Sequence, residues 1–172
     1  MPAAKTKGAP LIGSDNALEG RWGAPSSREL AALFHEAFVN ATGQAVRWAA
    51  ETVQGNRRFD RAWCVPFTGD DGVRGHFSLR WDAEFQRYLA GRCGAMAQRP
   101  EFVGAVLRAA AGRWALQQGA RHDVKIRLLP SAEALPDQEP HSSFGSSSAA
   151  LFVDAFVLEL GFSLENSQVS RD

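Results

Sequence analysis

The sequence has no excess of charge of either sign. Its 19 lysine and arginine residues balance 19 aspartate and glutamate residues, so the formal net charge is zero at pH 7. A domain that binds nucleic acid, or that docks on an anionic membrane, normally carries a basic excess or a clustered basic patch. The sequence therefore predicts no nucleic acid and no membrane among the partners of the protein.

Long hydrophobic runs are also absent. No apolar run in the sequence approaches the length of about 20 residues that a membrane-spanning helix needs. The first residues carry Lys5 and Lys7 but lack the apolar core of a signal peptide. We therefore expect a cytoplasmic protein.

Cysteine is scarce and the histidines are scattered. Cys64 and Cys93 stand alone, without the spacing of a disulfide framework or a metal site, and we interpret both as buried apolar side chains. None of the 4 histidines forms an i, i+4 pair or stands at metal-ligand spacing from a carboxylate. A Gly-x-Ser-x-Gly nucleophile elbow and a Gly-x-x-x-x-Gly-Lys phosphate loop are both lacking. The sequence thus predicts no metal site and no cofactor.

The clearest pattern that is present is a helix at residues 101–120. Apolar residues recur there at spacings of three and four, after Pro100 and up to Gly119. Two glycines interrupt it, Gly104 and Gly112, and each costs roughly 1 kcal/mol relative to alanine in a helix interior. We therefore expect another element to pack closely against the backbone of this helix.

A second helix is predicted from Ser26 or Ser27. The Ser-x-x-Glu pattern of Ser26 and Glu29 has the form of a capping box, in which two backbone N–H groups are satisfied reciprocally. Apolar residues follow at helical spacing, and Gly43 is expected to end the pattern.

Alternation with a period of two marks the sheet. From residue 73 to residue 81 apolar and polar side chains alternate, which predicts a strand with one wet face, and residues 68–72 before it have the composition of a hairpin turn. Residues 149–164 fit both helical and strand spacing, and we interpret them as a strand because of their β-rich composition. The other predicted elements are strand pieces in 46–53, 63–67 and 124–128, a helix at 83–94 capped by Asp82, and a loop or loose hairpin arm at 131–148.

These elements predict an α+β fold. Helices and strands are mixed without a regular βαβ repeat, which favours a mostly antiparallel sheet packed against two long helices and a shorter one. A length of 172 residues suits one domain. We place this domain at 27–164, between a flexible N-terminal arm at 1–26 and a frayed C-terminus at 165–172.

The order of elements over 73–164 resembles the CheC/CheX family of chemotaxis phosphatases, and more distantly the middle domain of flagellar switch proteins of the FliM kind. The segments that carry the resemblance are a strand GHFSLRW, a helix DAEFQRYLAGRCGAM, the helix at 101–120, a strand VKIRLLP that ends in proline, and a last strand FVDAFVLEL. The resemblance implies a pseudo-symmetric domain in which the first helix is the partner of the helix at 101–120.

The resemblance also implies a catalytic motif, Glu-x-x-Asn-x-x-x-Gly, on the second of these helices. In the family the acidic side chain engages a lysine of a phosphorylated receiver domain, and the asparagine positions the water that attacks the aspartyl phosphate. The receiver supplies Mg²⁺, so the resemblance implies no cofactor. Counting back from Gly112 places Arg108 at the asparagine position and Ala105 at the glutamate position. Neither residue can do the family's chemistry, so both are kept only as candidates for contact with a partner. For Arg108 the alternative interpretation is a solvated or snorkelling side chain.

The first helix offers a partial substitute. Counting back from Gly43 places Glu36 at the glutamate position, while Asn40 stands one residue later than the asparagine position. Residues four apart share a helix face, so Glu36 and Asn40 are candidate catalytic residues, with a plain solvated helix face as the alternative interpretation.

Three hypotheses follow from the sequence. In the first, the protein is a CheX-like domain without the usual catalytic pair that binds a receiver domain or another signalling protein, as a monomer or a homodimer. In the second, Glu36 and Asn40 make it an active aspartyl-phosphate phosphatase. In the third, it is a scaffold domain like a flagellar or secretion switch component, without phosphate chemistry.

Overall fold

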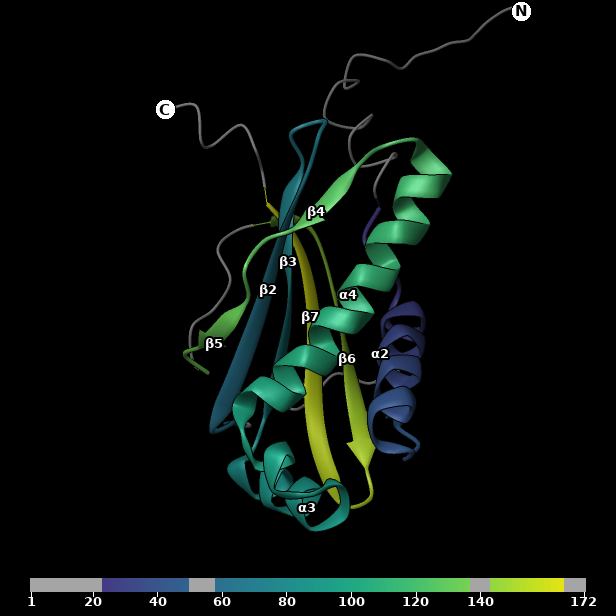
Figure 1. The fold of residues 1–172 in the computed structure, drawn as a ribbon. Helices are drawn as coiled ribbons and strands as arrows, with labels where there is room; N and C mark the ends of the chain where they lie inside the picture. Colours follow the sequence, from purple (N-terminus) through teal and green to yellow (C-terminus); the bar gives the residue numbers. More distant parts are fainter. Residues whose placement is uncertain (1–22, 50–57, 137–142, 166–172) are drawn as a thin grey trace, which may run out of the picture.

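A computed structural model describes residues 23–49, 58–136 and 143–165. The helices are α2 (Ser27–Thr42), α3 (Ala83–Cys93), the short 3-10 helix η2 (Ala95–Gln98) and α4 (Pro100–His122). The strands are β1 (Arg47–Ala49), β2 (Arg61–Gly69), β3 (Arg74–Trp81), β4 (Ile126–Leu128), β5 (Ala132–Ala134), β6 (Ser143–Val153) and β7 (Phe156–Glu165). In Figure 1, α2 and α4 lie side by side over one face of the sheet, and α3 lies at one end. The predicted α+β class is confirmed.

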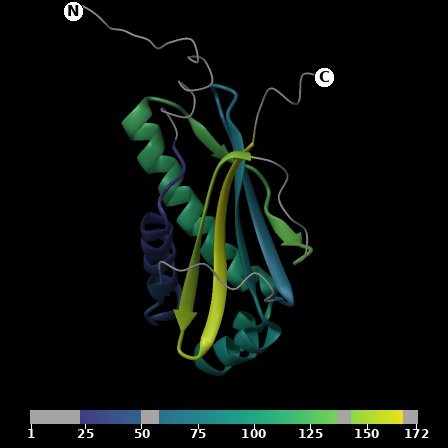
Figure 2. The same ribbon diagram turned by 180° about the vertical axis from the view of Figure 1, so that it is seen from behind.

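The strands form one antiparallel sheet. Their order is β1-β6-β7-β3-β2-β4, and β5 also pairs with β2. Every pairing between neighbours is antiparallel. Figure 2 shows the opposite face, over which no helix lies in the part of the chain that the structure describes. The described helices therefore cover one side of the sheet.

The core lies between the sheet and the helices. In β3, Phe77, Leu79 and Trp81 alternate into it, as the period-two pattern predicted. The ring centroid of Phe77 lies 5.0 Å from that of Phe162 on β7 and 5.2 Å from that of Trp114 on α4. Because burial of one phenylalanine side chain contributes roughly 1.5–3 kcal/mol, this aromatic cluster holds α4 over the middle strands.

The two interior glycines of α4 have different surroundings. A Cβ atom at Gly104 would lie 2.3 Å from Cε2 of Trp63, so the indole of this β2 residue packs directly on the helix backbone. At Gly112 the nearest atom would be Cδ1 of Leu128 at 3.7 Å, an ordinary contact. The predicted close approach to the helix backbone is confirmed at Gly104, whereas Gly112 has room for a side chain.

Both ends of α2 agree with the prediction. The hydroxyl of Ser26 accepts a hydrogen bond from the backbone N–H of Glu29, and Oε1 of Glu29 accepts one from the backbone N–H of Ser26 at 2.8 Å. Gly43 follows the helix in the left-handed conformation, with φ of 76°, and its N–H bonds to the carbonyl of Val39. The capping box and the glycine stop are confirmed.

The predicted end of α4 at Gly119 is wrong. The helix continues to His122, and Asp123 forms a left-handed cap with φ of 53° whose N–H donates to the carbonyl oxygen of Gly119. Glycine at position 119 serves another purpose. A Cβ atom there would lie 2.9 Å from the carbonyl oxygen of Val124, where the chain turns back toward the sheet.

The start of α3 also differs from the prediction. Asp82 is the residue before the helix, but its side chain forms no cap hydrogen bond. The backbone N–H of Ala83 instead donates to Oδ2 of Asp60 at 3.2 Å, and the backbone N–H of Asp60 donates to Oδ1 of Asp82 at 3.3 Å. A carboxylate from the segment before β2 therefore supplies the cap, which sequence spacing alone does not reveal.

The last third of the chain contains more strand than predicted. The segment 131–148, predicted as a loop or loose hairpin arm, includes β5 and the start of β6, because pairing with β2 and β7 outweighs the low strand propensity of its serines. The single strand predicted at 149–164 is the end of β6 and β7, joined by a tight turn at Asp154 with φ of 54°. Aspartate tolerates this left-handed conformation better than most residues do.

Some predictions fall outside the described residues. Of the strand pieces predicted at 46–53, the structure describes β1 and none of the residues from 50 onward. The predicted arm at 1–26 is described only from residue 23, and the predicted frayed end at 165–172 only at its first residue.

Candidate partner-binding surface

The helices α2 and α4 form one continuous surface over the sheet. They run in opposite directions, and Oε1 of Glu36 on α2 lies 2.8 Å from Nε of Arg113 on α4. The two side chains are 45% and 51% exposed. An ion pair this exposed contributes only about 0–1 kcal/mol to stability. The carboxylate of Glu36 is therefore positioned by Arg113 but can exchange it for another partner at little cost.

Asn40 lies one turn after Glu36 and is exposed. A separation of four residues corresponds to a rise of about 6 Å along the helix axis. Because α2 and α4 are antiparallel, the part of α4 beside Asn40 is closer to the N-terminus of α4 than Arg113 is. The predicted pair of Glu36 and Asn40 therefore shares the outer surface of the helix layer.

The two candidate contact residues on α4 have different environments. Ala105 is exposed on the outer side of the helix. Arg108 is half-buried, and its Nη1 donates a hydrogen bond of 2.7 Å to the carbonyl oxygen of Leu129, just after β4. The guanidinium thus ties α4 to the segment that leaves the sheet, and Ala105 is the candidate of the two that is open to a partner.

The sequence interpretation missed Arg113 as the partner of Glu36. Nothing in the spacing of these residues predicts their contact, because it depends on how α2 and α4 pack on the sheet. The opposite charges alone are no signal in a chain with 19 residues of each sign.

A groove of about 500 Å³ opens between the N-terminal half of α2 and the C-terminal half of α4. Leu33 and Trp114 also line the groove but are only 8% and 2% exposed, and residues 23–25 line it as well. The polar residues around it are Glu29 and Glu36 from α2 and Arg113, Gln117, Gln118, Arg121 and His122 from α4. The sequence has no signal for this groove, because the groove forms only when both helices are in place.

The residues with perturbed pKa values lie elsewhere, on the face of the sheet without helices. Burial, with a smaller effect of the Glu165 carboxylate, raises the pKa of the Cys64 thiol to about 11. Burial lowers the pKa of His76, and Glu165 partly opposes that shift. A thiol with a raised pKa is a poor nucleophile at neutral pH, so these residues do not form an activated cysteine site.

Among the described residues, no group of three or more histidine, cysteine, aspartate or glutamate side chains is placed to hold a metal ion. In the same parts of the chain, no helix is long and apolar enough to span a membrane.

Comparison with known proteins identifies the fold. No protein-family model matches the chain, and no curated protein matches it by sequence. Among solved structures, the chemotaxis protein CheX from Vibrio vulnificus superposes with a TM-score of 0.66 at 10% identity, covering 83% of this chain and 97% of that chain. CheX in a CheX–CheY–BeF3–Mg²⁺ complex from Borrelia burgdorferi gives 0.57 at 13% identity, covering 81% and 97%.

A flagellar protein shares the same architecture. The FliM middle domain from Vibrio alginolyticus superposes with a TM-score of 0.52 at 12% identity, covering 84% of this chain and 93% of that domain. A CheC-like protein from Shewanella oneidensis gives 0.63 at 9% identity, covering 80% and 96%. The resemblance stated from the sequence is confirmed at the level of the fold. The chain has the α+β fold that CheX, CheC-like proteins and the FliM middle domain share.

Proposed function

We propose that the protein is a CheX-like signalling domain that binds the receiver domain of a response regulator and lacks the family's catalytic pair. The fold supports this proposal, as does the presence of CheY in the complex formed by the similar CheX of Borrelia burgdorferi. The outer surface of α2 and α4 is the proposed binding surface. We place the protein in the cytoplasm, where receiver domains act, and a homodimer is compatible with the proposal.

The proposed loss of catalysis rests on Ala105 and Arg108, the two residues of α4 at the motif positions. Ala105 has no carboxylate with which to engage a lysine of the receiver. Arg108 has no amide to orient a water, and its guanidinium is bound to the carbonyl of Leu129. Positioning of the attacking water is the main requirement for phosphoryl transfer to water, so α4 lacks the groups for that step.

The residues on α2 do not restore the geometry. Val39 stands where the motif has asparagine, and Asn40 follows it. A shift of one residue turns a side chain by about 100° around the helix axis. Glu36 is in addition paired with Arg113. The amide of Asn40 therefore points in another direction than the asparagine of the motif, and the carboxylate of Glu36 already has a partner. Both observations support binding of a receiver rather than hydrolysis of its aspartyl phosphate.

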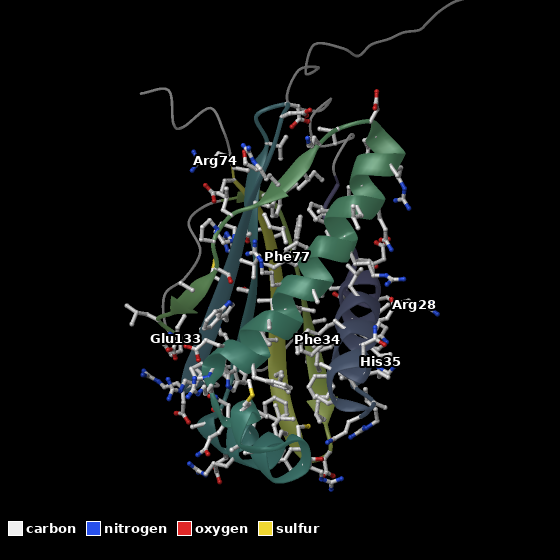
Figure 3. All side chains as sticks on the ribbon, in the orientation of Figure 1. Arg28, Phe34, His35, Arg74, Phe77 and Glu133 are labelled. Carbon is white, nitrogen blue, oxygen red and sulfur yellow. The ribbon has the colours of Figure 1, made fainter. Side chains whose placement is uncertain are left out.

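The test is the decay of a phosphorylated receiver domain with and without the protein, together with a direct measurement of binding. We expect the receiver to bind and its dephosphorylation rate to stay unchanged. Ala105→Arg on the outer surface should weaken binding, whereas Arg28→Glu, on the side of α2 that faces away from α4 (Figure 3), should not. Absence of binding would refute the proposal.

The second candidate function is an active phosphatase, which the shared exposed face of Glu36 and Asn40 favours. In that case the protein accelerates decay, and Asn40→Ala abolishes the acceleration. Arg113→Gln then raises the rate further, because it frees the carboxylate of Glu36. A scaffold of the flagellar switch kind is the third candidate, and it would bind neither the phosphorylated nor the unphosphorylated receiver.

A further inference from the structure

The ion pair of Glu36 with Arg113 lies on the proposed binding surface and is open to solvent. Its 2.8 Å contact joins the carboxylate of a side chain that is 45% exposed to the guanidinium of one that is 51% exposed. Ion pairs with so much access to water are weak, because water can solvate both charges when the pair opens. A stronger acceptor that approaches from outside can therefore take Arg113 from Glu36.

The surface beside Arg113 offers little competition for such an acceptor. The exposed residues one turn before and after Arg113 on α4 are uncharged, namely Ala109, Leu116 and Gln117. The side-chain amide of Asn40, one turn after Glu36, has no hydrogen-bond partner among the described residues. A guanidinium and an amide, which both donate hydrogen bonds, are therefore available beside a single carboxylate.

Other arginines of the two helices are placed differently. Nη1 of Arg108 donates to the carbonyl oxygen of Leu129 at 2.7 Å. Arg28 lies on the side of α2 that faces away from α4 (Figure 3). Arg121 follows Arg113 by eight residues, a rise of about 12 Å along α4. Arg113 is therefore the cation at the junction of α2 and α4 that a docked partner can reach.

We propose that Arg113 is the residue with which this surface distinguishes a phosphorylated receiver from an unphosphorylated one. This role rests on the proposed function, because it requires the receiver to dock on α2 and α4. A phosphoryl group carries more negative charge than a carboxylate, and its three acceptor oxygens suit the planar fork of a guanidinium. It displaces Glu36 from Arg113, and the released carboxylate turns to solvent. An unphosphorylated receiver leaves the ion pair closed.

Glu36 acts in this exchange as a competitor of the phosphoryl group. Its carboxylate occupies Arg113 before binding and repels the phosphoryl oxygens afterwards. Glu36→Gln should therefore tighten the binding of a phosphorylated receiver about twofold to fivefold and leave that of the unphosphorylated receiver unchanged. A carboxylate that only joined α2 to α4 would give no such increase in affinity.

The test is isothermal titration calorimetry of the full chain with the CheY-type receiver domains of the same organism. Each receiver is measured unmodified and in its BeF3–Mg²⁺ form, in which BeF3 stands in for the phosphoryl group. We expect Arg113→Gln to weaken binding of the BeF3 form about tenfold and to change that of the unmodified form less than about twofold. Glu36→Gln should shift the affinity for the BeF3 form in the opposite direction.

Two variants control for the general effect of positive charge. Arg28→Gln removes the same charge from the far side of α2, and Arg121→Gln removes it further along α4. Both should leave the ratio of the two affinities unchanged. A receiver that binds, but whose two forms Arg113→Gln weakens equally or not at all, overturns this role and leaves the proposed function in place. So does an Arg121→Gln variant that lowers the ratio as much as Arg113→Gln. If no receiver binds in either form, the proposed function and this role fail together.

Discussion

The substitutions Gly104→Ala and Gly112→Ala form a matched pair on one helix. Both replace an interior glycine of α4 by the best helix former, so each gains roughly 1 kcal/mol of helix propensity. They differ in what the new methyl group meets. At position 104 it would lie 2.3 Å from Cε2 and 2.6 Å from Cδ2 of Trp63, whereas at position 112 the nearest atom is 3.7 Å away. We expect Gly112→Ala to be more stable than the wild type and Gly104→Ala to be less stable than Gly112→Ala.

The difference between the two variants measures the cost of overpacking, because the gain in propensity is common to both. Cε2 and Cδ2 belong to the fused part of the indole, and Trp63 is only 8% exposed, so the ring cannot swing into solvent. Overpacking of this kind costs about 1–3 kcal/mol. For a chain of this size, a difference of 1 kcal/mol corresponds to about 2–4 °C in Tm. Gly104→Ala should therefore melt about 2–12 °C below Gly112→Ala.

Urea unfolding followed by circular dichroism gives the free energies, and a double-mutant cycle tests the cause. In a Trp63→Leu background the indole is gone, so Gly104→Ala should become as favourable as Gly112→Ala. The expected coupling energy is about 1–3 kcal/mol, within the range seen for residues in contact. Equal stability of Gly104→Ala and Gly112→Ala in the wild-type background would show that the indole yields without cost, and would refute the reasoning.

Three further predictions concern single side chains. Arg108→Met should destabilise the protein by about 1–3 kcal/mol, because it leaves the half-buried carbonyl of Leu129 without its charged donor; a loss below the error of urea unfolding would contradict this. The pKa of His76 is lowered from 6.5 in the folded state, so the unfolded chain takes up the proton first. The contribution of neutral His76 is thus fully present above pH 6.5 and is lost as the pH falls toward the folded pKa. Stability should fall more steeply below pH 6.5 in the wild type than in His76→Gln, and parallel pH profiles would be evidence against it. The pKa of the Cys64 thiol is about 11, against an ordinary 9.0. At pH 8 Cys64 should therefore react with iodoacetamide about 100-fold more slowly in the folded protein than in the unfolded chain. Peptide mass spectrometry measures both rates, and equal rates would disprove the effect of burial.

Local signals predicted the helices and the central strands well. The capping box of Ser26 and Glu29, the glycine stop at Gly43 and the alternation through Phe77 each depend on neighbours in the sequence, and each is confirmed. The order of these elements was enough to suggest the fold that the solved structures share.

The errors in the fold arose where distant segments decide the local structure. The serines of β6 are strand residues because β7 pairs with them, although their own propensity favours a loop. The end of α4 was placed too early because Gly119 looks like a stop, whereas its missing side chain makes room for the carbonyl of Val124. In the same way Asp60, and not Asp82, caps α3.

Less of the candidate site could be predicted than of the fold. The sequence placed Glu36, Asn40 and Ala105 on helices, and their exposure on the outer surface follows from the packing of those helices. The ion pair of Glu36 with Arg113 and the groove beside it required both helices in place. Side-chain environments that are shared between two elements have no signature in either element alone.

The position of α2 has a consequence for the order in which the chain folds. This helix, near the start of the described chain, packs on α4 and on β6, and β1 pairs only with β6 among the described strands. One of the elements on which α2 packs, β6, therefore lies in the last part of the described chain to be synthesised. Contacts between such distant segments slow folding, because the loop between them must close before they form. During synthesis α2 can pack on α4 first, whereas its contacts with β6 and the pairing of β1 with β6 form only after the hairpin of β6 and β7 has emerged.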